Sequence, residues 1–451
     1  MNYKAKAVFL LIFIFQVNLL CIENIVIYSI QREHEIYTSF FFNSFNFTKE
    51  DSWNCTWGNN YGVNGEAIAF DSSNNVYLAG ERYALEEDIN SIIFLVKYNQ
   101  SGVLQWNYTW KRYEDYCIGL VIDAFDNIYI TGNSYNYSMG RYDIFLIKLN
   151  TSGQEEWIHI WGGNSNDVVN AITTDTLGNI YLLGQTSSFG GDDDLLLAKY
   201  NSFGILQWNL LWSADVRGSE ILIDSSNDIY IAGIYYIFNY EDLGLTSYEI
   251  FLLKYNSDRV MQWLKKWSVN VYERPMLIDS SLNLYIRGYT NNNRNVLAKY
   301  NSSGVLLWQH ILNQTSGHYE DIALDSFGNI YITGTNHISR TDYEIFIRKF
   351  NSSGILLWEK AVKGLCSEIL WCNAINLDST DNIYITGTAY RSAFIIKNPQ
   401  LGSLTPIKPF SYSYNIPLLD WILILIILVF SICGIIAFLY KFRIRKRENL
   451  E

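Results

Sequence analysis

A ten-residue phrase that opens with Asp and ends in Gly recurs seven times along this chain of 451 residues. Its first copy is D-S-S-N-N-V-Y-L-A-G, and in every copy a Tyr stands six residues after the Asp. The copies begin at Asp71, Asp123, Asp175, Asp224, Asp279, Asp325 and Asp378. A sequence period of about 50 residues is typical of propeller blades. The repeat therefore indicates a ring of similar units.

Each repeat predicts four strands. The phrase follows an apolar stretch such as 67–70, and two short alternating stretches joined by an Asp/Ser/Asn turn are typical of a β-hairpin. A third strand ends in Lys-Tyr-Asn or a close variant, as in 92–99, and a turn such as N-S-S-G leads into a fourth strand that contains Trp, such as Trp106. Four strands per repeat are what a propeller blade requires.

The ends of the array predict how the ring closes. A Trp strand follows a Lys strand six times, a seventh copy around Trp53 precedes the first Asp phrase, and the last repeat has Pro399 where its own Trp strand should begin. We predict that the Trp53 strand completes the blade of Asp378, which would leave no open strand edge between the first and last blades. The expected fold is an all-β, seven-bladed propeller over residues 52–398.

These phrases resemble the SBBP-type β-propeller repeat of bacterial and archaeal surface proteins. The resemblance rests on the Asp turn, Gly-Asn-Ile-Tyr-x-x-Gly, Lys-Tyr-Asn, Ser-Gly and Trp, and it covers about three quarters of the chain. It implies a fold and a surface setting, and it implies no particular substrate.

The flanking segments predict a surface protein with one membrane span. Residues 1–22 are interpreted as a signal peptide or signal anchor, and 23–51 receive no assignment. Residues 418–440 are predicted to form a transmembrane helix, because 421–440 are twenty residues without a formal charge. The basic tail, 441–451, places the C-terminus in the cytoplasm and the propeller outside. The Pro-containing segment 399–417 is interpreted as a stalk that lifts the ring off the membrane.

The charge argues against a nucleic-acid partner. The chain carries a formal net charge of −12; the tail contributes +3 and residues 1–30 contribute +1, which leaves −16 for residues 31–440. A protein that neutralises phosphates needs the opposite sign.

Cysteine and asparagine patterns suggest covalent modifications. Outside the first segment and the predicted membrane helix there are four cysteines, and the local spacing C-S-E-I-L-W-C favours a disulfide between Cys366 and Cys372, although four cysteines allow three pairings. The N-x-S/T pattern gives glycosylation candidates. They include Asn99, Asn107, Asn136, Asn150, Asn301, Asn313 and Asn351. Several of them belong to the repeated turn, whose own preference for Asn and Ser accounts for part of the pattern.

Residues that could carry catalysis do not follow the repeat. The five histidines are scattered, so no nucleophile and base pair is indicated, and no cofactor is expected. Asp192, Asp193 and Asp194 form an acidic run that could offer oxygen ligands to calcium, although such runs are more often simply solvated.

The loops suggest where a partner binds. The first-to-second and third-to-fourth turns of each repeat are short and alike, whereas the second-to-third loops vary and are longest in repeat four, at 234–248. Variable loops on a rigid scaffold are a common place for recognition. The candidate ligand-binding residues are Tyr235, Tyr236, Tyr240 and Asp242. We therefore expect a binding or adhesion module for a glycan or protein; the alternatives are an extracytoplasmic hydrolase or lyase with its site at the channel mouth, or a structural envelope protein.

Overall fold

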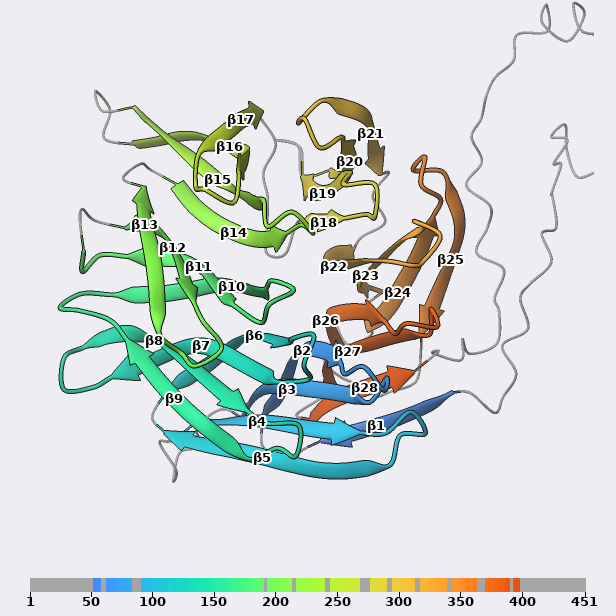
Figure 1. Ribbon diagram of the computed structural model, residues 1–451. Helices are drawn as coiled ribbons and strands as arrows, with labels where there is room; N and C mark the ends of the chain where they lie inside the picture. The colour runs from blue at the N-terminus through green and yellow to red at the C-terminus, as the bar shows by residue number, and fades with distance from the viewer. Residues whose placement is uncertain are drawn as a thin grey trace, which may run out of the picture. The chain divides into compact units, whose positions relative to one another are not determined.

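The computed structural model shows a closed ring of seven four-stranded antiparallel sheets (Figure 1). It describes residues 52–57, 62–82, 91–112, 114–189, 193–212, 216–239, 244–267, 276–289, 294–312, 317–338, 343–362, 370–389 and 392–397. All of these residues belong to one compact unit, Phe45–Gly402. The predicted all-β, seven-bladed propeller is confirmed, and the structure assigns each repeat its four strands.

The blades follow one another along the chain. Blade one comprises β2 (Val63–Phe70), β3 (Val76–Arg82), β4 (Ser91–Tyr98) and β5 (Leu104–Arg112). Blade two comprises β6 (Asp115–Ile122), β7 (Ile128–Asn136), β8 (Arg141–Leu149) and β9 (Glu155–Trp161). Blade three comprises β10 (Asp167–Thr174), β11 (Ile180–Thr186), β12 (Asp194–Tyr200) and β13 (Leu206–Trp212). Blade four comprises β14 (Val216–Ile223), β15 (Ile229–Asn239), β16 (Gly244–Tyr255) and β17 (Met261–Trp267).

The last three blades repeat this order. Blade five comprises β18 (Met276–Ile278), β19 (Leu284–Tyr289), β20 (Asn295–Tyr300) and β21 (Leu306–Leu312). Blade six comprises β22 (Gly317–Leu324), β23 (Ile330–His337), β24 (Tyr343–Phe350) and β25 (Leu356–Val362). Blade seven comprises β26 (Leu370–Leu377), β27 (Ile383–Ala389), β28 (Ser392–Lys397) and, from the other end of the array, β1 (Trp53–Trp57).

The first described strand closes the ring, as the sequence predicts. β1 pairs antiparallel with β28 in a register that runs from Trp53 opposite Lys397 to Trp57 opposite Ala393. Trp53 packs its ring near Tyr384 of the same blade, with a centroid distance of 6.0 Å. The edge that an incomplete seventh blade would expose is therefore covered by the chain's own strand.

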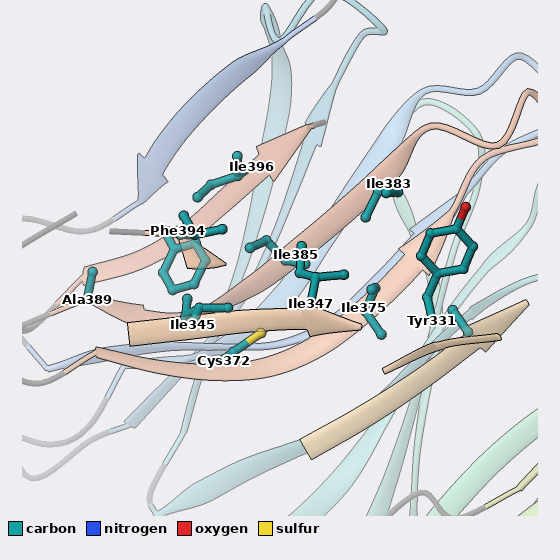
Figure 2. Close-up of a cluster of buried hydrophobic side chains, with 12 residues drawn as sticks. Tyr331, Ile345, Ile347, Cys372, Ile375, Ile383, Ile385, Ala389, Phe394 and Ile396 are labelled. Carbon is teal, nitrogen blue, oxygen red and sulfur yellow. The ribbon is translucent and has the colours of Figure 1, made fainter. Parts of the chain in front are cut away.

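The hydrophobic core is divided among the blade interfaces. Seven main clusters of buried apolar side chains occur, and each combines residues of two neighbouring blades. Figure 2 shows the cluster between blades six and seven, where Ile345 and Ile347 of β24 meet Phe394 of β28. The β-branched and aromatic residues of the second and third strands suit such a two-sided burial. Each interface between neighbouring blades therefore has a hydrophobic core of its own.

The ring has two faces that differ in their connections. We call the face that carries the first-to-second and third-to-fourth turns, such as 71–75 and 99–103, the turn face; the opposite face is the loop face. The first strand of each blade lies nearest the common centre (Figure 1) and contacts the first strands of neighbouring blades, as β2 contacts β6 and β26. A first strand therefore runs along the centre from the loop face to the turn face.

Candidate functional site

The repeated Asp of the turn face is saturated by hydrogen bonds inside its own blade. In blade one, Asp71 Oδ1 accepts the backbone N–H groups of Ser73 (3.0 Å) and Asn75 (2.8 Å). Asp71 Oδ2 accepts the Tyr77 hydroxyl (3.0 Å) and lies 3.0 Å from Lys97 Nζ. The Lys97 ammonium also lies 4.9 Å from the centroid of the Tyr77 ring, a cation–π distance. Both carboxylate oxygens of this Asp are engaged within the blade.

The same cluster recurs with small changes. The ordinary form, with Lys near the Asp carboxylate, occurs at Lys199 (3.1 Å), Lys299 (3.4 Å) and Lys349 (2.9 Å). In blade two the lysine, Lys148, pairs with Glu156 instead (2.9 Å), and in blade four it pairs with Asp228 (2.7 Å). The shared Asp, Tyr and Lys therefore hold the hairpin to the third strand, and we assign them to the scaffold.

Hydrogen bonding also sets the acidity of these carboxyl groups. Burial opposes ionisation of Asp71, but hydrogen bonds from Asn75 and Lys97 leave its pKa below the ordinary value. The pKa of Asp325 is lowered in the same way, against the effect of burial, by Asn329 and Lys349. The Asp71 and Asp325 carboxylates are therefore ionised and fixed at neutral pH, which suits a structural role.

The loop-face half of the first strands carries a feature that the sequence did not reveal. In six described blades the pairing of the first two strands shifts by one residue at the same place, five residues before the repeated Asp. Such a β-bulge redirects a side chain and is common beside functional sites. The bulge residues, all half-buried, are Glu66, Ile118, Asn170, Ser219, Glu320 and Asn373. We call these six residues the bulge ring.

The bulge ring contacts the neighbouring blades. Asn170 Nδ2 donates to the Gly218 carbonyl of blade four (2.8 Å), and Asn373 Nδ2 donates to the Gly65 carbonyl of blade one (3.1 Å). The side chains of Asn170 and Asn373 are therefore held in fixed positions by the next inner strand, which is a form of preorganisation.

The densest polar group lies between blades one and seven. The Asn64 amide donates to the carboxylates of Glu66 and Glu81, the second at 3.4 Å, and its carbonyl oxygen accepts from Asn373 Nδ2 (2.8 Å) and from the Thr388 hydroxyl. Glu81 is 3% exposed and also accepts the Cys117 backbone N–H (2.9 Å). Two carboxylates thus converge on one amide at the loop-face end of the inner strands. We call Asn64, Glu66, Glu81, Asn373 and Thr388 the rim network.

The predicted recognition loop of blade four is mostly a hairpin. The pairing of β15 and β16 continues from Tyr235 opposite Glu249 to Asn239 opposite Gly244. Tyr235 packs against the core between blades three and four, with Lys266 Nζ 3.1 Å from the centroid of its ring. Tyr236 is half-buried within β15, and Tyr240 and Asp242 lie outside the described residues. The interpretation of 234–248 as a loop was wrong because I-Y-Y-I-F is itself a β-forming run.

The structure separates the acidic run of blade three. Asp193 is exposed and accepts the Ser187 hydroxyl (2.8 Å), whereas Asp194 is 3% exposed as the first residue of β12. Asp192 lies outside the described residues. Among the residues that the structure describes, no three His, Cys, Asp or Glu side chains gather as metal ligands would.

Cys55 and Cys372 form no disulfide with any residue that the structure describes. Cys372 is completely buried between blades six and seven, with its sulfur 3.2 Å from the Thr333 hydroxyl, and burial raises the pKa of its thiol. Cys366, its predicted disulfide partner, lies outside the described residues. Cys372 therefore packs as a small apolar side chain in this core.

The glycosylation candidates fall into two environments. Asn99, Asn150, Asn301 and Asn351 begin third-to-fourth turns, where each Oδ1 accepts two backbone N–H groups. Asn201 and Asn256 do the same in turns without an acceptor sequence, so turn formation is enough to explain Asn at this place.

The remaining candidates differ from this turn type. Asn107 is exposed on β5, and Asn136 ends β7, where its side-chain oxygen accepts the Ser138 hydroxyl (2.7 Å). Asn313 is outside the described residues, as are the predicted segments 1–22, 23–51, 399–417, 418–440 and 441–451. Within the described part of the chain, no helix has the length and apolar character needed to cross a membrane.

A cavity of about 190 Å³ lies between blades three and four. Its walls are mostly apolar, and several of its leucines also belong to the core of that interface. The lining residues are Leu195, Leu197, Leu210, Leu211, Trp212, Ile231, Leu253, Tyr255 and Arg259. The cavity offers few polar groups to orient a ligand, in contrast to the rim network.

Comparison with known proteins agrees with the repeat pattern. Residues 156–190 match the family model SBBP, described as a beta-propeller repeat. This segment is an SBBP β-propeller repeat. It covers most of β9, the whole of β10 and β11, and the turn between them, so one SBBP repeat spans two neighbouring blades. The same strands and Asp turn recur around the ring, as described above.

Similarity to individual proteins is low. An uncharacterised WD repeat-containing protein of Acanthamoeba polyphaga mimivirus is 23% identical over 160 residues, a match that covers 26% of this chain and 11% of that protein. The chain therefore spans about a tenth of that relative.

Two solved structures have some similarity to this chain. A polysaccharide lyase of family PL25, an ulvan lyase, superposes with a TM-score of 0.52 at 11% identity, covering 77% of this chain and 96% of that one. The WD40 domain of Neurospora crassa Pan2 matches with a TM-score of 0.47 at 9% identity, covering 78% and 97% of the two chains. At 11% identity the likeness to the ulvan lyase concerns the fold alone.

Proposed function

We propose that this chain is a single-pass cell-surface protein whose propeller binds a glycan or protein partner at the loop face. The observation that carries the proposal is the bulge ring together with the rim network. Amide and carboxylate groups gather there at the inner strands and are held by neighbouring blades, as Asn373 is held by Gly65. Fixed polar groups of this kind suit the hydroxyls of a sugar or the backbone of a peptide. The surface setting rests on the predicted span 418–440.

Binding tests use the full chain in detergent against a glycan array and a panel of surface proteins. The double variant Glu66→Gln, Glu320→Gln removes two charges from the bulge ring while keeping side-chain size. We expect it to weaken binding about 10- to 100-fold, the range for hydrogen bonds to charged groups. Glu155→Gln is the matched control, because Glu155 is exposed on the outermost strand β9. Equal binding by the bulge-ring variant and the control would reject this site.

A second variant tests the hairpin of blade four. Replacing residues 238–246 by Asn-Gly joins Ile237 to Ser247, which are already paired, through a two-residue turn. Tyr235 and Tyr236 stay in the shortened hairpin. If only this variant loses binding, the partner is recognised by the hairpin tip and the bulge ring is not the site.

One observation favours an enzymatic alternative. Glu66 and Glu81 converge on the Asn64 amide, and paired carboxylates can serve as acid and base in glycan cleavage. The ulvan lyase, which shares the fold, acts on a polysaccharide according to its name. Incubating each bound glycan with the chain and measuring chain length separates the two functions: shortening that Glu66→Gln abolishes, with binding retained, would establish a hydrolase or lyase.

A further inference from the structure

The turn face concentrates the exposed apolar side chains of the propeller. Twelve large apolar residues among those described are more than half exposed, and ten of them lie at turns of the turn face or directly beside them. The ten are Val103, Phe125, Leu177, Phe203, Ile205, Val260, Met261, Val305, Phe327 and Ile355. The other two, Met139 and Ile338, follow second strands and lie on the loop face. We call the ten residues the apolar tips.

The apolar tips stand on a rigid platform. Neighbouring turns are joined by hydrogen bonds: Ser72 donates to Asp126 through its backbone N–H (2.8 Å) and its hydroxyl (2.7 Å), and Ser326 contacts Asp381 in the same way. The outer turns are linked as well, since Trp308 Nε1 donates to the Ser352 carbonyl of the next blade (3.2 Å). Because the turns cannot fold inward independently, the tips stay presented to the surroundings.

Both described ends of the chain lie at this same face. Lys397 ends a third strand, where a third-to-fourth turn would begin, and its Nζ donates to the Gln100 carbonyl in the corresponding turn of blade one (3.3 Å). Trp53 begins the paired strand and donates from Nε1 to the same carbonyl (2.9 Å). The chain that continues toward the predicted membrane span therefore leaves from the turn face.

We propose that the turn face lies against the bilayer that holds the chain's own membrane span, with the apolar tips in the lipid headgroup region. This inference rests on the proposed single-pass surface location. The twenty residues between Lys397 and residue 418 span at most about 70 Å when fully extended, so the end of the turn face where Lys397 lies stays within that distance of the predicted membrane span. Exposed aliphatic and aromatic groups at such a surface gain by leaving water. The ring would rest on the membrane and direct its loop face outward.

The charges of the turn face indicate the kind of lipid. Two acidic residues of the turn face, Asp126 and Asp381, are half-buried, and a third, Asp258, is exposed. In the third-to-fourth turn of blade four, the basic residue Arg259 has its guanidinium carbon 5.4 Å from the centroid of the Trp208 ring. Such a surface does not attract anionic headgroups. The lipid that fits this face is therefore zwitterionic. The apolar tips drive the contact, so salt should not change its strength.

The experiment uses the full chain reconstituted at one copy per phosphatidylcholine nanodisc. In a chain whose six native cysteines are replaced by Ser, a spin label is placed at Ser353→Cys on the turn face or at Met139→Cys on the loop face; both residues are exposed. Accessibility to oxygen and to a water-soluble nickel complex reports whether each label contacts lipid or water. We expect lipid contact at position 353 and water at position 139. Water at both positions, or lipid at position 139, would overturn the proposal.

Matched variants test the cause. Phe203→Ser with Phe327→Ser removes two tips that are 74% and 83% exposed, and we expect the lipid-contacting population of the label at position 353 to fall about tenfold. Tyr137→Ser with Met139→Ser, on the loop face, should leave that population unchanged. Circular dichroism checks that both variants fold. An equal effect of the two pairs would show that the apolar tips do not hold the face to lipid.

Two further outcomes distinguish a failure of the single-pass location from a failure of the lipid-binding face. If carbonate extracts the chain from membranes, the single-pass location fails, and lipid contact by the label at position 353 on added vesicles would then support the lipid-binding face alone. If the label contacts water in single-copy discs but shows dipolar broadening in vesicles with several copies, the turn face binds a second copy of this chain and the lipid proposal is wrong.

Discussion

Asn295 is a buried side-chain amide that has no hydrogen-bond partner among the residues that the structure describes. It begins β20 of blade five, is 0% exposed, and neither its Nδ2 nor its Oδ1 is hydrogen-bonded. The position lies four residues before the repeated Lys, and every other blade places an apolar residue there. These residues are Ile93, Ile144, Leu195, Ile250, Ile345 and Ala393, all buried. Blade five thus carries a polar group at a core position.

Replacing this amide by Leu should stabilise the protein. Leu keeps the branching of Asn and puts two methyl groups where the amide oxygen and nitrogen stood. A buried polar group without a partner costs about 1–3 kcal/mol, so we expect Asn295→Leu to raise the free energy of unfolding by about 2 kcal/mol. A propeller of roughly 350 residues has an unfolding entropy of about 0.7 kcal/mol/K, so Tm should rise by about 3 °C.

Urea unfolding of the full chain, followed by tryptophan fluorescence, measures this change, and calorimetry gives Tm. Asn373→Leu is the matched control, because the Asn373 amide donates to Asn64 Oδ1 (2.8 Å) and to the Gly65 carbonyl (3.1 Å). The control should lower stability by about 1–3 kcal/mol. If Asn295→Leu is destabilising, or if both variants are stabilising, the missing hydrogen bonds of Asn295 are not the cause and our reasoning is refuted.

Three other predictions concern ring closure and pH. Trp53→Ala should lower the free energy of unfolding by about 3 kcal/mol and make β1 sensitive to protease. The control Trp106→Ala, inside the array, should lower the free energy of unfolding without cleavage in β1. Equal cleavage of β1 in the two variants would contradict closure by this strand. Burial disfavours the ionised form of Asp175, but hydrogen bonds from Asn179 and Lys199 outweigh it and lower its pKa below 3.8. The stability that the ionised Asp175 contributes is therefore full above about pH 4 and is lost as pH falls through the pKa of the native state. The urea midpoints of wild type and Asp175→Asn should converge in acid, and a difference that stays constant with pH would refute this. Burial raises the pKa of Tyr200 and Tyr300 from 10.0 to about 12, so the stability that these neutral phenols contribute below pH 10 should be lost as pH rises toward 12. Absorbance at 295 nm should show a late-titrating fraction of tyrosines in the native chain. Complete titration near pH 10 without unfolding would contradict this prediction.

The repeat made the architecture predictable. Because the Asp phrase, the Lys strand and the Trp strand keep one period, the number of blades and the pairing of Trp53 with the last blade follow from counting strands. The contact of the Tyr77 hydroxyl with Asp71 also lies within one hairpin, where local spacing is informative.

The candidate site was less accessible to sequence reasoning. A β-bulge is a one-residue shift in pairing, and composition does not reveal it; Glu66 and Asn373 look like ordinary strand residues in the sequence. The rim network joins Asn64 to Asn373, more than three hundred positions away along the chain, so only the closed ring brings these residues together. The apolar residues after several third-to-fourth turns, such as Val305, are visible in the sequence, but their gathering on one face depends on the topology.

Ring closure by β1 has a consequence for synthesis. β1 is made first among the described strands, and its partner β28 follows about 340 residues later, which takes roughly 17–70 seconds at ~5–20 residues per second. Through that interval β1 has no sheet to join, and its two Trp side chains, Trp53 and Trp57, have no seventh blade to pack in. Blades one to six can form in order as they emerge, but the last sheet must wait for both ends of the array. Completion of the protein is therefore timed by its final strand, and this interval is when a chaperone would be most needed.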